Sequence, residues 1–180
     1  MAKDQRLVAE ITELINVVYA DAEAGLWVDG AARTTTTEME DLIASNQIAL
    51  AQTDDEMVGC IRIQQLDGTV GEFGMLAAHP ERRGDGIGRD LVRFAEELSY
   101  RRGLTIMQLE LLVPREWSHP SKVFLHDWYT RIGYRPVRTG IIEEAYPQLA
   151  PLLATPCDFV VYHKPLSAAG SAARPDVRSR

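Results

Sequence analysis

The sequence predicts a mixed α/β (α+β) domain over residues 1–166, in which a mostly antiparallel central sheet is flanked by helices. Apolar residues at helical spacing alternate along the chain with short stretches of period two, so both kinds of element are present. Three short strands joined by tight turns within residues 47–78 predict antiparallel neighbours. The last of them leads through a turn and a helix into a further strand, and such a βαβ unit makes its two strands parallel.

Composition argues against several classes of protein. The chain has 180 residues, of which 46% are hydrophobic and 25% charged, as in an ordinary globular domain. The net charge of −7 argues against nucleic acid as a partner; it favours cationic partners such as amines, or serves solubility alone. No apolar run approaches the roughly 18 residues of a membrane span, so we expect no membrane association.

The two cysteines, Cys60 and Cys157, form neither a metal-ligand pattern nor a disulfide framework. We therefore expect no metal site and two reduced thiols. The first residues are polar and no apolar core follows them, so we expect no signal peptide. Together these features favour a cytoplasmic protein.

The first half of the chain opens with two expected helices. The first covers residues 3–20, and the second is a short helix at 38–44, with Thr36 or Thr37 as its N-cap. The apolar side chains that share one face of the first helix are Leu7, Ile11, Leu14, Ile15 and Val18.

Three strands follow at residues 47–52, 57–65 and 70–78, where the hydrophobic period changes to two. The dipeptide Asp67-Gly68 between the second and third is a strong hairpin signal. His79-Pro80 ends the third strand.

Residues 82–88 form a turn of nearly bare backbone, Arg-Arg-Gly-Asp-Gly-Ile-Gly, which opens the next helix. The first N–H groups of a helix lack intrahelical partners, and the peptide dipoles add about half a positive charge there. Glycine lets an anion approach these groups closely, and Arg82 and Arg83 add charged donors. The stretch therefore predicts an anion site, with a surface loop capped by arginines as the simpler alternative.

The helix itself is expected at residues 87–102 and ends at Gly103, which suits a left-handed C-terminal residue. Its expected apolar stripe consists of Ile87, Leu91, Phe94, Ala95 and Leu98.

The kind of anion follows from what the turn lacks. The lysine and Ser/Thr that end an ATP- or GTP-binding P-loop are absent, because Gly88 is followed by Arg89 and Asp90. The dinucleotide fingerprint G-x-G-x-x-G also fails, since Arg89 or Leu91 stands where its third glycine belongs. A nucleotide-binding ATPase is therefore disfavoured.

Beyond Gly103 a strand is expected at 105–113, stopped by Pro114. A helix should then run from Ser121, its expected N-cap, to about Arg131. The apolar stripe expected on this helix consists of Val123, Phe124, Trp128 and Ile132.

The end of the chain is less regular. An extended piece begins at 134–137, a short helix lies around 143–145, and a final strand is expected at 157–164. Residues 167–180 are small, polar and basic, and we expect a disordered tail there.

Two signatures resemble those of the GCN5-related N-acetyltransferase (GNAT) family. The spacing Arg83-x-x-Gly86-x-Gly88, after a strand that ends in His-Pro, resembles the family's coenzyme A pyrophosphate loop. Tyr129, followed after three residues by Gly133-Tyr134, resembles the family's closing helix and lies about 40 residues further on. The resemblance covers about residues 70–164. It departs from the family at the start, where a strand normally precedes the first helix.

The resemblance implies acetyl-CoA as a co-substrate. In the family fold the two parallel strands splay apart, helped by a bulge in the first, and the pantetheine arm pairs with that strand. The pyrophosphate rests on the amides of residues 84–89. The residues to which cofactor binding carries over are Leu76, Ala77, Ala78, Arg82, Arg83, Gly84, Asp85, Gly86, Ile87, Gly88, Arg89 and Ser121.

Ser121 stands where many family members place an asparagine that contacts pantetheine. The adjacent Lys122 either approaches the 3′-phosphate or is a solvated helix charge, and we expect the solvated position.

The family's chemistry is direct attack of an amine on a thioester, which needs a general acid and a base. Tyr129 occupies the family position of the acid; the alternative is a packed tyrosine with a hydrogen-bonded hydroxyl. Glu72 begins the first parallel strand and is implied as the base, directly or through water, unless it is a solvated strand-end charge. Glu110, His119 and His126 are further candidates for the base.

The implied activity is N-acetylation of a small-molecule or peptide amine in a ternary complex. The alternatives are a non-catalytic acyl-CoA-binding regulatory module, or an acyltransferase that uses a longer acyl group or a hydroxyl acceptor. A homodimer is compatible with the resemblance, because final strands in this family often pair between subunits.

Acceptor specificity is expected in residues 21–46, 114–120 and 138–156, which hold no interpretable motif. Leu26-Trp27 either covers the mouth of the site or plugs the core, and Trp117 either shapes a substrate pocket or belongs to an interaction surface.

Overall fold

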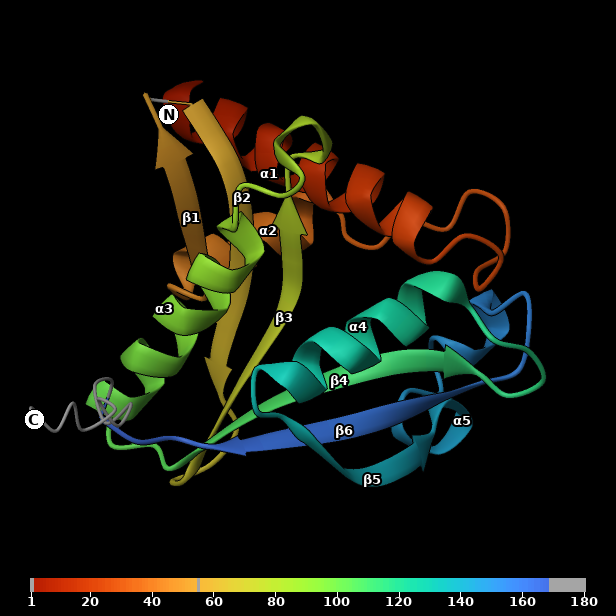
Figure 1. Ribbon diagram of the computed structural model, residues 1–180. Helices are drawn as coiled ribbons and strands as arrows, with labels where there is room; N and C mark the ends of the chain where they lie inside the picture. The colour runs from red at the N-terminus through yellow and green to blue at the C-terminus, as the bar shows by residue number, and fades with distance from the viewer. Residues whose placement is uncertain (1, 55, 169–180) are drawn as a thin grey trace, which may run out of the picture.

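The computed structural model describes residues 2–54 and 56–168 of the chain. Its strands are β1 (Ile48–Thr53), β2 (Glu56–Gln65), β3 (Val70–Ala78), β4 (Ile106–Pro114), β5 (Arg135–Ile141) and β6 (Cys157–Pro165). Its helices are α1 (Ala2–Ala22), α2 (Thr36–Ala44), α3 (Ile87–Arg101), α4 (Pro120–Arg131) and α5 (Ile142–Ala145), with 3₁₀ turns η1 (Pro80–Arg82) and η2 (Ala150–Leu152). The six strands form one sheet in the order β1-β2-β3-β4-β6-β5 (Figure 1).

The sheet is antiparallel except between β3 and β4, which confirms the expected mixed fold. The parallel ladder consists of the pairs Val70↔Ile106, Gly71↔Met107 and Glu72↔Gln108. Beyond Glu72 the two strands splay apart, as Figure 1 shows. We call this opening the fork.

A bulge in β3 helps to open the fork. Met75 has a left-handed φ of 47°, and the register of β3 against β2 shifts at the same place, where Cys60 pairs with Ala77 but Arg62 pairs with Gly74. The extra residue bends β3 away from β4 and increases its twist. The expected bulge in this strand is therefore confirmed.

Two clusters of buried side chains cover the two faces of the sheet. Cys60 of β2 belongs to the cluster under α1 and α2, whereas its neighbour Ile61 belongs to the cluster under α3 and α4. Successive residues of a strand point to opposite faces, so the two helix pairs lie on opposite sides of the sheet. A third, smaller cluster packs the segment of α5 and η2 against β6 through Ile142 and Phe159.

The stripe predicted for α4 is wrong in part. Val123 and Phe124 are 49% and 60% exposed, whereas Lys122 and Tyr129 are buried. Residues 122 and 129 are two helical turns apart and share one face, and this is the face that α4 turns toward the rest of the molecule. Similarly, Phe94 of the α3 stripe is exposed, while Leu91 and Ala95 are buried as expected.

The expected helix caps differ by a residue or two. The N-cap of α2 is Thr35, whose hydroxyl accepts a hydrogen bond from the Glu38 N–H, rather than Thr36 or Thr37. His119 caps α4 in place of Ser121, because its ring nitrogen accepts the Ser121 N–H at 3.2 Å. Gly103 has the expected left-handed φ, 84°.

Both ends of the chain bear on the expectations. The described chain opens with α1, and no strand precedes that helix among the residues described. The expected tail falls mainly on residues 169–180, which lie outside the described residues. Within the described ranges, no helix has both the length and the apolarity to span a bilayer.

Candidate active site

The turn that leads into α3 is built around two glycines in the left-handed region. Gly84 has φ 100° and Gly86 has φ 84°, conformations that L side chains rarely adopt. A Cβ on Gly86 would also lie 2.9 Å from Nη2 of Arg89. The first α-helical hydrogen bond runs from the Asp90 N–H to the Gly86 carbonyl, 3.0 Å, so the amides of residues 87–89 precede the hydrogen-bonded helix. The backbone therefore fits a phosphate-sized anion.

The arginines near the turn differ in their availability. Nε of Arg82 lies 2.8 Å from Oδ2 of Asp85, so this cation braces the loop itself. Arg89 lies over Gly86, with its Nε 3.7 Å from Oδ1 of Asp90. Arg83 is exposed and has no ion-pair partner in the part of the chain that the structure describes. Arg83 is therefore the cation best placed to meet a bound anion.

The fork supplies an open strand edge next to this turn. Residues 73–78 of β3 continue past the last rung of the ladder, Glu72↔Gln108, and lead through His79 into the glycine turn. The side chain of Ala77 is buried in the cluster beneath α1, while Leu76 and Ala78 are half-buried. An extended ligand such as pantetheine fits along such an edge as an added strand.

Tyr129 lies on the buried face of α4, beside the start of the fork. Its ring centroid is 6.0 Å from that of Phe73, the first residue of β3 beyond the ladder. Burial, with a smaller contribution from neighbouring Tyr19, raises the pKa of Tyr129 far above the ordinary value for a tyrosine. The phenol is therefore protonated at physiological pH and can donate a hydrogen bond.

Tyr19 is a second phenol in this region, and the sequence reasoning did not single it out. Burial raises its pKa to about 12, while Arg33 and a backbone hydrogen bond at Leu76 act in the opposite direction. The guanidinium carbon of Arg33 lies 5.3 Å from the Tyr19 ring centroid. The spacing of four residues between Ile15 and Tyr19 places both on one helix face, which was the available signal.

Two carboxylates share the other face of the sheet at the base of the fork. Glu72 accepts hydrogen bonds from Nε2 of Gln64 at 2.6 Å and from Nε2 of Gln108 at 2.8 Å. Glu110 accepts the Tyr146 hydroxyl at 2.6 Å. Burial raises the pKa of Glu110, the Tyr146 hydrogen bond opposes this, and the charge of Glu72 adds to it. Glu72 is therefore a half-buried, hydrogen-bonded group rather than a solvated strand-end charge, and Glu110 lies close enough to feel its charge.

The two candidate histidines make other contacts. Nε2 of His119 lies 3.1 Å from the Ala24 carbonyl, and its other nitrogen caps α4. Nδ1 of His126 lies 2.6 Å from the Tyr162 hydroxyl. Neither ring is brought to Glu72, so these bonds favour structural positions for both.

The expectation that Lys122 is solvated is wrong. Its side chain is 5% exposed, and its Nζ lies 2.6 Å from Oε1 of Glu23, which is 8% exposed. The other carboxylate oxygen of Glu23 accepts the indole N–H of Trp27 at 2.6 Å. The ammonium group is buried because the start of α4 packs against the end of α1, where Glu23 lies. Lys122 thus joins α4 to the link between α1 and α2.

That link also pairs with the segment before β6. The Val28 N–H donates to the Leu152 carbonyl at 2.8 Å, and the Ala154 N–H donates to the Leu26 carbonyl at 2.9 Å. Leu26 is fully buried, as expected of a core residue, whereas Trp27 is half-buried. Two of the three stretches in which acceptor specificity was expected, 21–46 and 138–156, are therefore held side by side.

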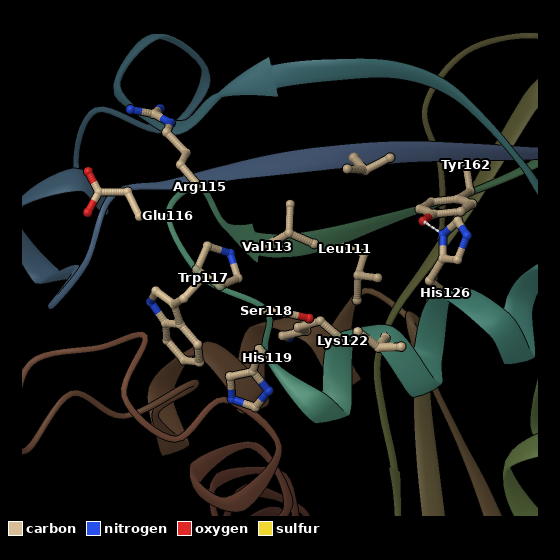
Figure 2. A pocket seen from close by; sticks show the side chains of 13 residues that line it. Leu111, Val113, Arg115, Glu116, Trp117, Ser118, His119, Lys122, His126 and Tyr162 are labelled. Atoms are coloured by element: carbon tan, nitrogen blue, oxygen red, sulfur yellow. Dashed lines mark hydrogen bonds between the residues drawn. The ribbon is translucent and has the colours of Figure 1, made fainter.

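Trp117 lines a hollow of about 510 Å³ between α4 and the strands β4 and β6. Figure 2 shows Trp117 and His119 at one end of it, and Tyr162 with His126 at the other. No residue of β3 lines this hollow, whereas Leu111 and Val113 of β4, beyond the last rung of the parallel ladder, do. Trp117 therefore shapes a pocket, but Glu72 is not among the residues that line it.

The two cysteines are free and buried. Burial raises the pKa of Cys60 to about 12 and that of Cys157 to about 11, so both are thiols rather than thiolates at neutral pH. A cysteine nucleophile is disfavoured. In the described part of the chain no group of three or more potential metal ligands occurs.

Several solved structures share this arrangement of elements. An aminoglycoside 6′-N-acetyltransferase complexed with coenzyme A superposes with a TM-score of 0.63 at 16% identity, over 92% of this chain and 93% of that one. A GNAT-family acetyltransferase from Staphylococcus aureus gives 0.62 at 16% identity, over 89% and 93% of the two chains. A GNAT-family acetyltransferase from Elizabethkingia anophelis with acetyl-CoA bound gives 0.56 at 16% identity, over 73% and 84%. At such identities these similarities concern the fold.

The sequence itself identifies the family. No curated protein matches it. A family model described as the acetyltransferase (GNAT) domain matches residues 44–136, which is just over half of the chain and includes the three-strand meander, the glycine turn and Tyr129. The chain belongs to the GNAT acetyltransferase family.

Proposed function

We propose that this protein transfers the acetyl group of acetyl-CoA to an amine of a small molecule or peptide, by direct attack in a ternary complex. The observation that carries the proposal is the fork, which opens at Glu72 and leads along β3 into the glycine turn. Coenzyme A or acetyl-CoA is present in solved structures of similar fold, which supports the choice of co-substrate.

The proposed binding mode uses this chain's backbone more than its side chains. The amides of residues 84–89 hold the pyrophosphate, and Arg83 adds a charge-assisted hydrogen bond. The pantetheine arm lies along β3 at residues 76–78, with Ser121 in the first turn of α4 on the other side of the fork. Such a backbone cradle tolerates few side chains, which explains glycine at positions 84 and 86.

The proposed reaction removes two protons from the nitrogen of an ammonium ion and supplies one to the sulfur. An alkylamine with a pKa of about 10.4 is neutral in roughly one molecule in 2,500 at pH 7, which is worth about 4–5 kcal/mol. Glu72 takes the proton of the attacking amine, directly or through water. The neutral amine nitrogen bonds to the thioester carbonyl carbon, the carbon–sulfur bond breaks, and the Tyr129 phenol donates a proton to the sulfur as it leaves. The second proton of the new amide nitrogen then returns to the Tyr129 phenolate, while the proton taken by Glu72 passes to solvent.

The carboxylates favour a cationic acceptor. Glu72 and Glu110 lie on the same face of the sheet, and the charge of Glu72 raises the pKa of Glu110. A protonated amine is attracted to such a site before it loses its proton. Two of the proteins with a similar fold are named aminoglycoside 6′-acetyltransferases, which is compatible with an amine acceptor.

The test is thiol release from acetyl-CoA in the presence of a panel of primary amines, together with thermal shifts. We expect coenzyme A to raise the melting temperature, ATP and NAD to have no effect, and release to require an amine. A module that only binds acyl-CoA would give the shift without release.

Two variants check the binding site in the same assay. Gly86→Glu forces a side chain into the left-handed turn and against Arg89, and should abolish the coenzyme A shift. Gly68→Glu places the same charge where a Cβ meets nothing within 4 Å and should retain the shift. Arg83→Glu, in an exposed position, should weaken binding without unfolding the turn. Full coenzyme A affinity in both Gly86→Glu and Arg83→Glu would overturn the proposed pyrophosphate site.

A further inference from the structure

We propose that Arg62 and His163 are positioning residues that act on Glu72 through two glutamines. This inference rests on the proposed function, in which Glu72 is the base. Gln64 of β2, Gln108 of β4 and His163 of β6 lie in one row with Glu72 of β3 across the sheet, and Arg62 lies two residues before Gln64 on β2.

The row is a continuous chain of short hydrogen bonds. Nη2 of Arg62 lies 2.7 Å from Oε1 of Gln64, whose Nε2 lies 2.6 Å from Oε1 of Glu72. On the other side, Nε2 of His163 lies 2.9 Å from Oε1 of Gln108, whose Nε2 lies 2.8 Å from Oε2 of Glu72. Each oxygen of the carboxylate thus has its own amide donor.

The direction of every bond follows from donor and acceptor inventories. A guanidinium can only donate, so the Gln64 oxygen must face Arg62 and its NH₂ group must face Glu72. An ionised carboxylate can only accept, so Gln108 also turns its NH₂ group to Glu72 and its oxygen to His163. His163 must then carry a proton on Nε2. The two outer residues therefore determine which end of each amide reaches the carboxylate.

The row lies where the orientation of Glu72 matters most. The pair Glu72↔Gln108 is the last rung of the parallel ladder, immediately before the fork. Gln108 is buried, so a flip of its amide would leave its NH₂ group facing the ring of His163 and its oxygen facing a carboxylate. With one donor on each oxygen, the carboxylate cannot rotate freely, and each oxygen keeps a second lone pair for a proton.

The other charged groups near Glu72 have partners of their own and do not orient its carboxylate. Glu110 is bonded to Tyr146, and Arg138 acts on those two groups. Arg62 also donates to Oε1 of Gln47 at 2.9 Å, which fixes the guanidinium in turn.

The central experiment compares His163→Phe, which keeps a ring but removes the donor, with His163→Gln, whose Nε2–H can replace it. We expect His163→Phe to lower kcat by roughly 10- to 100-fold, because a catalytic group out of place by about 1 Å costs that much. The KM for acetyl-CoA should stay within about twofold, since the cofactor site is untouched, and His163→Gln should recover most of kcat. Arg62→Met and Arg62→Lys form the corresponding pair on the other side.

A second set of measurements separates positioning from general damage. In a Glu72→Gln background, His163→Phe should change kcat by less than about twofold, because its effect passes through Glu72. The matched control is Gln65→Met, an exposed β2 residue that donates only to the Asp67 carbonyl, and it should leave kcat unchanged. Melting temperatures of all variants show whether the fold is kept.

The outcomes distinguish this inference from the proposed function. Absence of thiol release by the wild type with every amine would overturn the proposed function and the inference with it. Release that is normal in His163→Phe and Arg62→Met, or an undiminished effect of His163→Phe in the Glu72→Gln background, would overturn the inference alone. A loss of kcat in His163→Phe that is largely recovered in His163→Gln, and that is absent in the Glu72→Gln background, would support the inference.

Discussion

The phenol of Tyr129 has to be neutral to act as an acid, and its surroundings keep it so. It packs among Phe73, Tyr134 and Tyr162 on the buried face of α4, and burial raises its pKa. A group held this far from its ordinary pKa does not titrate between pH 6 and 9. Any pH dependence of the rate in that range therefore belongs to another group.

We expect Tyr129→Phe to lower kcat by about 10²- to 10⁴-fold, the usual contribution of general acid catalysis. The ring and its packing remain, so the melting temperature and the KM for acetyl-CoA should change little. Steady-state thiol release measures the effect, with Tyr100→Phe, an exposed tyrosine of α3, as the control. Equal kcat values for the two variants would show that Tyr129 is only a packing residue.

For single residues, the sequence was informative where a motif specifies a position. It did not reveal residues whose role depends on a contact with a distant part of the chain. Tyr129 and one of the two left-handed glycines, Gly86, stand at signature positions. The partners of Glu72 are ordinary glutamines, one of them 36 residues away in the chain, and Glu23 is 99 residues from Lys122. Neither spacing nor residue type reveals such pairs before the strands and helices are placed.

Among the elements, α4 is connected to the rest of the molecule by a buried ion pair. Its first turn is tied to the end of α1 by Lys122 and Glu23, and His119 contacts the carbonyl of Ala24 in the same link. Buried ion pairs contribute little beyond a well-packed apolar pair, but breaking one leaves an uncompensated charge.

Lys122→Met should therefore lower the free energy of unfolding by about 3–5 kcal/mol, because Glu23 stays buried without its cation. The double variant Lys122→Met/Glu23→Gln should recover most of that loss. Urea unfolding measures both, and Arg6→Met, which breaks a pair with side chains 82% and 42% exposed, should cost less than about 1 kcal/mol. A loss for Lys122→Met as small as that for Arg6→Met would contradict the assigned pairing.

The element pattern was well predicted because periodicity reports it directly. The three antiparallel strands and the parallel pair agree with the expectation, and the bulge agrees with what the family resemblance implied. The face of α4 was wrong because Val123 and Phe124 satisfy a helical apolar period without being covered by another element. Periodicity counts apolar residues, but it does not show what packs on them.

Across the whole molecule, buried hydroxyls and thiols dominate the response to alkaline pH. Burial raises the pKa of Tyr19 and of Cys60 to about 12, and raises those of Tyr129 and Tyr134 as well. In the unfolded chain these groups ionise near their ordinary values, about 10 for tyrosine and 8.5 for cysteine. The folded state thus holds protons that the unfolded state has already lost.

The contribution of these groups to stability should therefore be constant below about pH 8.5, and the free energy of unfolding should fall above it, first through the thiols and then, above about pH 10, through the phenols. Each group contributes about 1.4 kcal/mol per pH unit once it is ionised in the unfolded chain alone. Urea unfolding at pH 8, 10 and 11 gives the curve. A free energy of unfolding that is unchanged at pH 11 would contradict the burial of these groups.

The parallel ladder has one more consequence. In the part of the chain that the structure describes, the backbone ladder between β3 and β4, which joins β1, β2 and β3 to β4, β6 and β5, has three residue pairs. If the pantetheine arm lies along β3 as proposed, its amides form hydrogen bonds with main-chain groups of β3 that β4 does not pair with. Bound acetyl-CoA would then connect the two halves of the sheet as well as react, and the fork would become more rigid only after the cofactor binds. An acceptor that binds second would meet a complete binding site, which favours an ordered mechanism in which acetyl-CoA binds first.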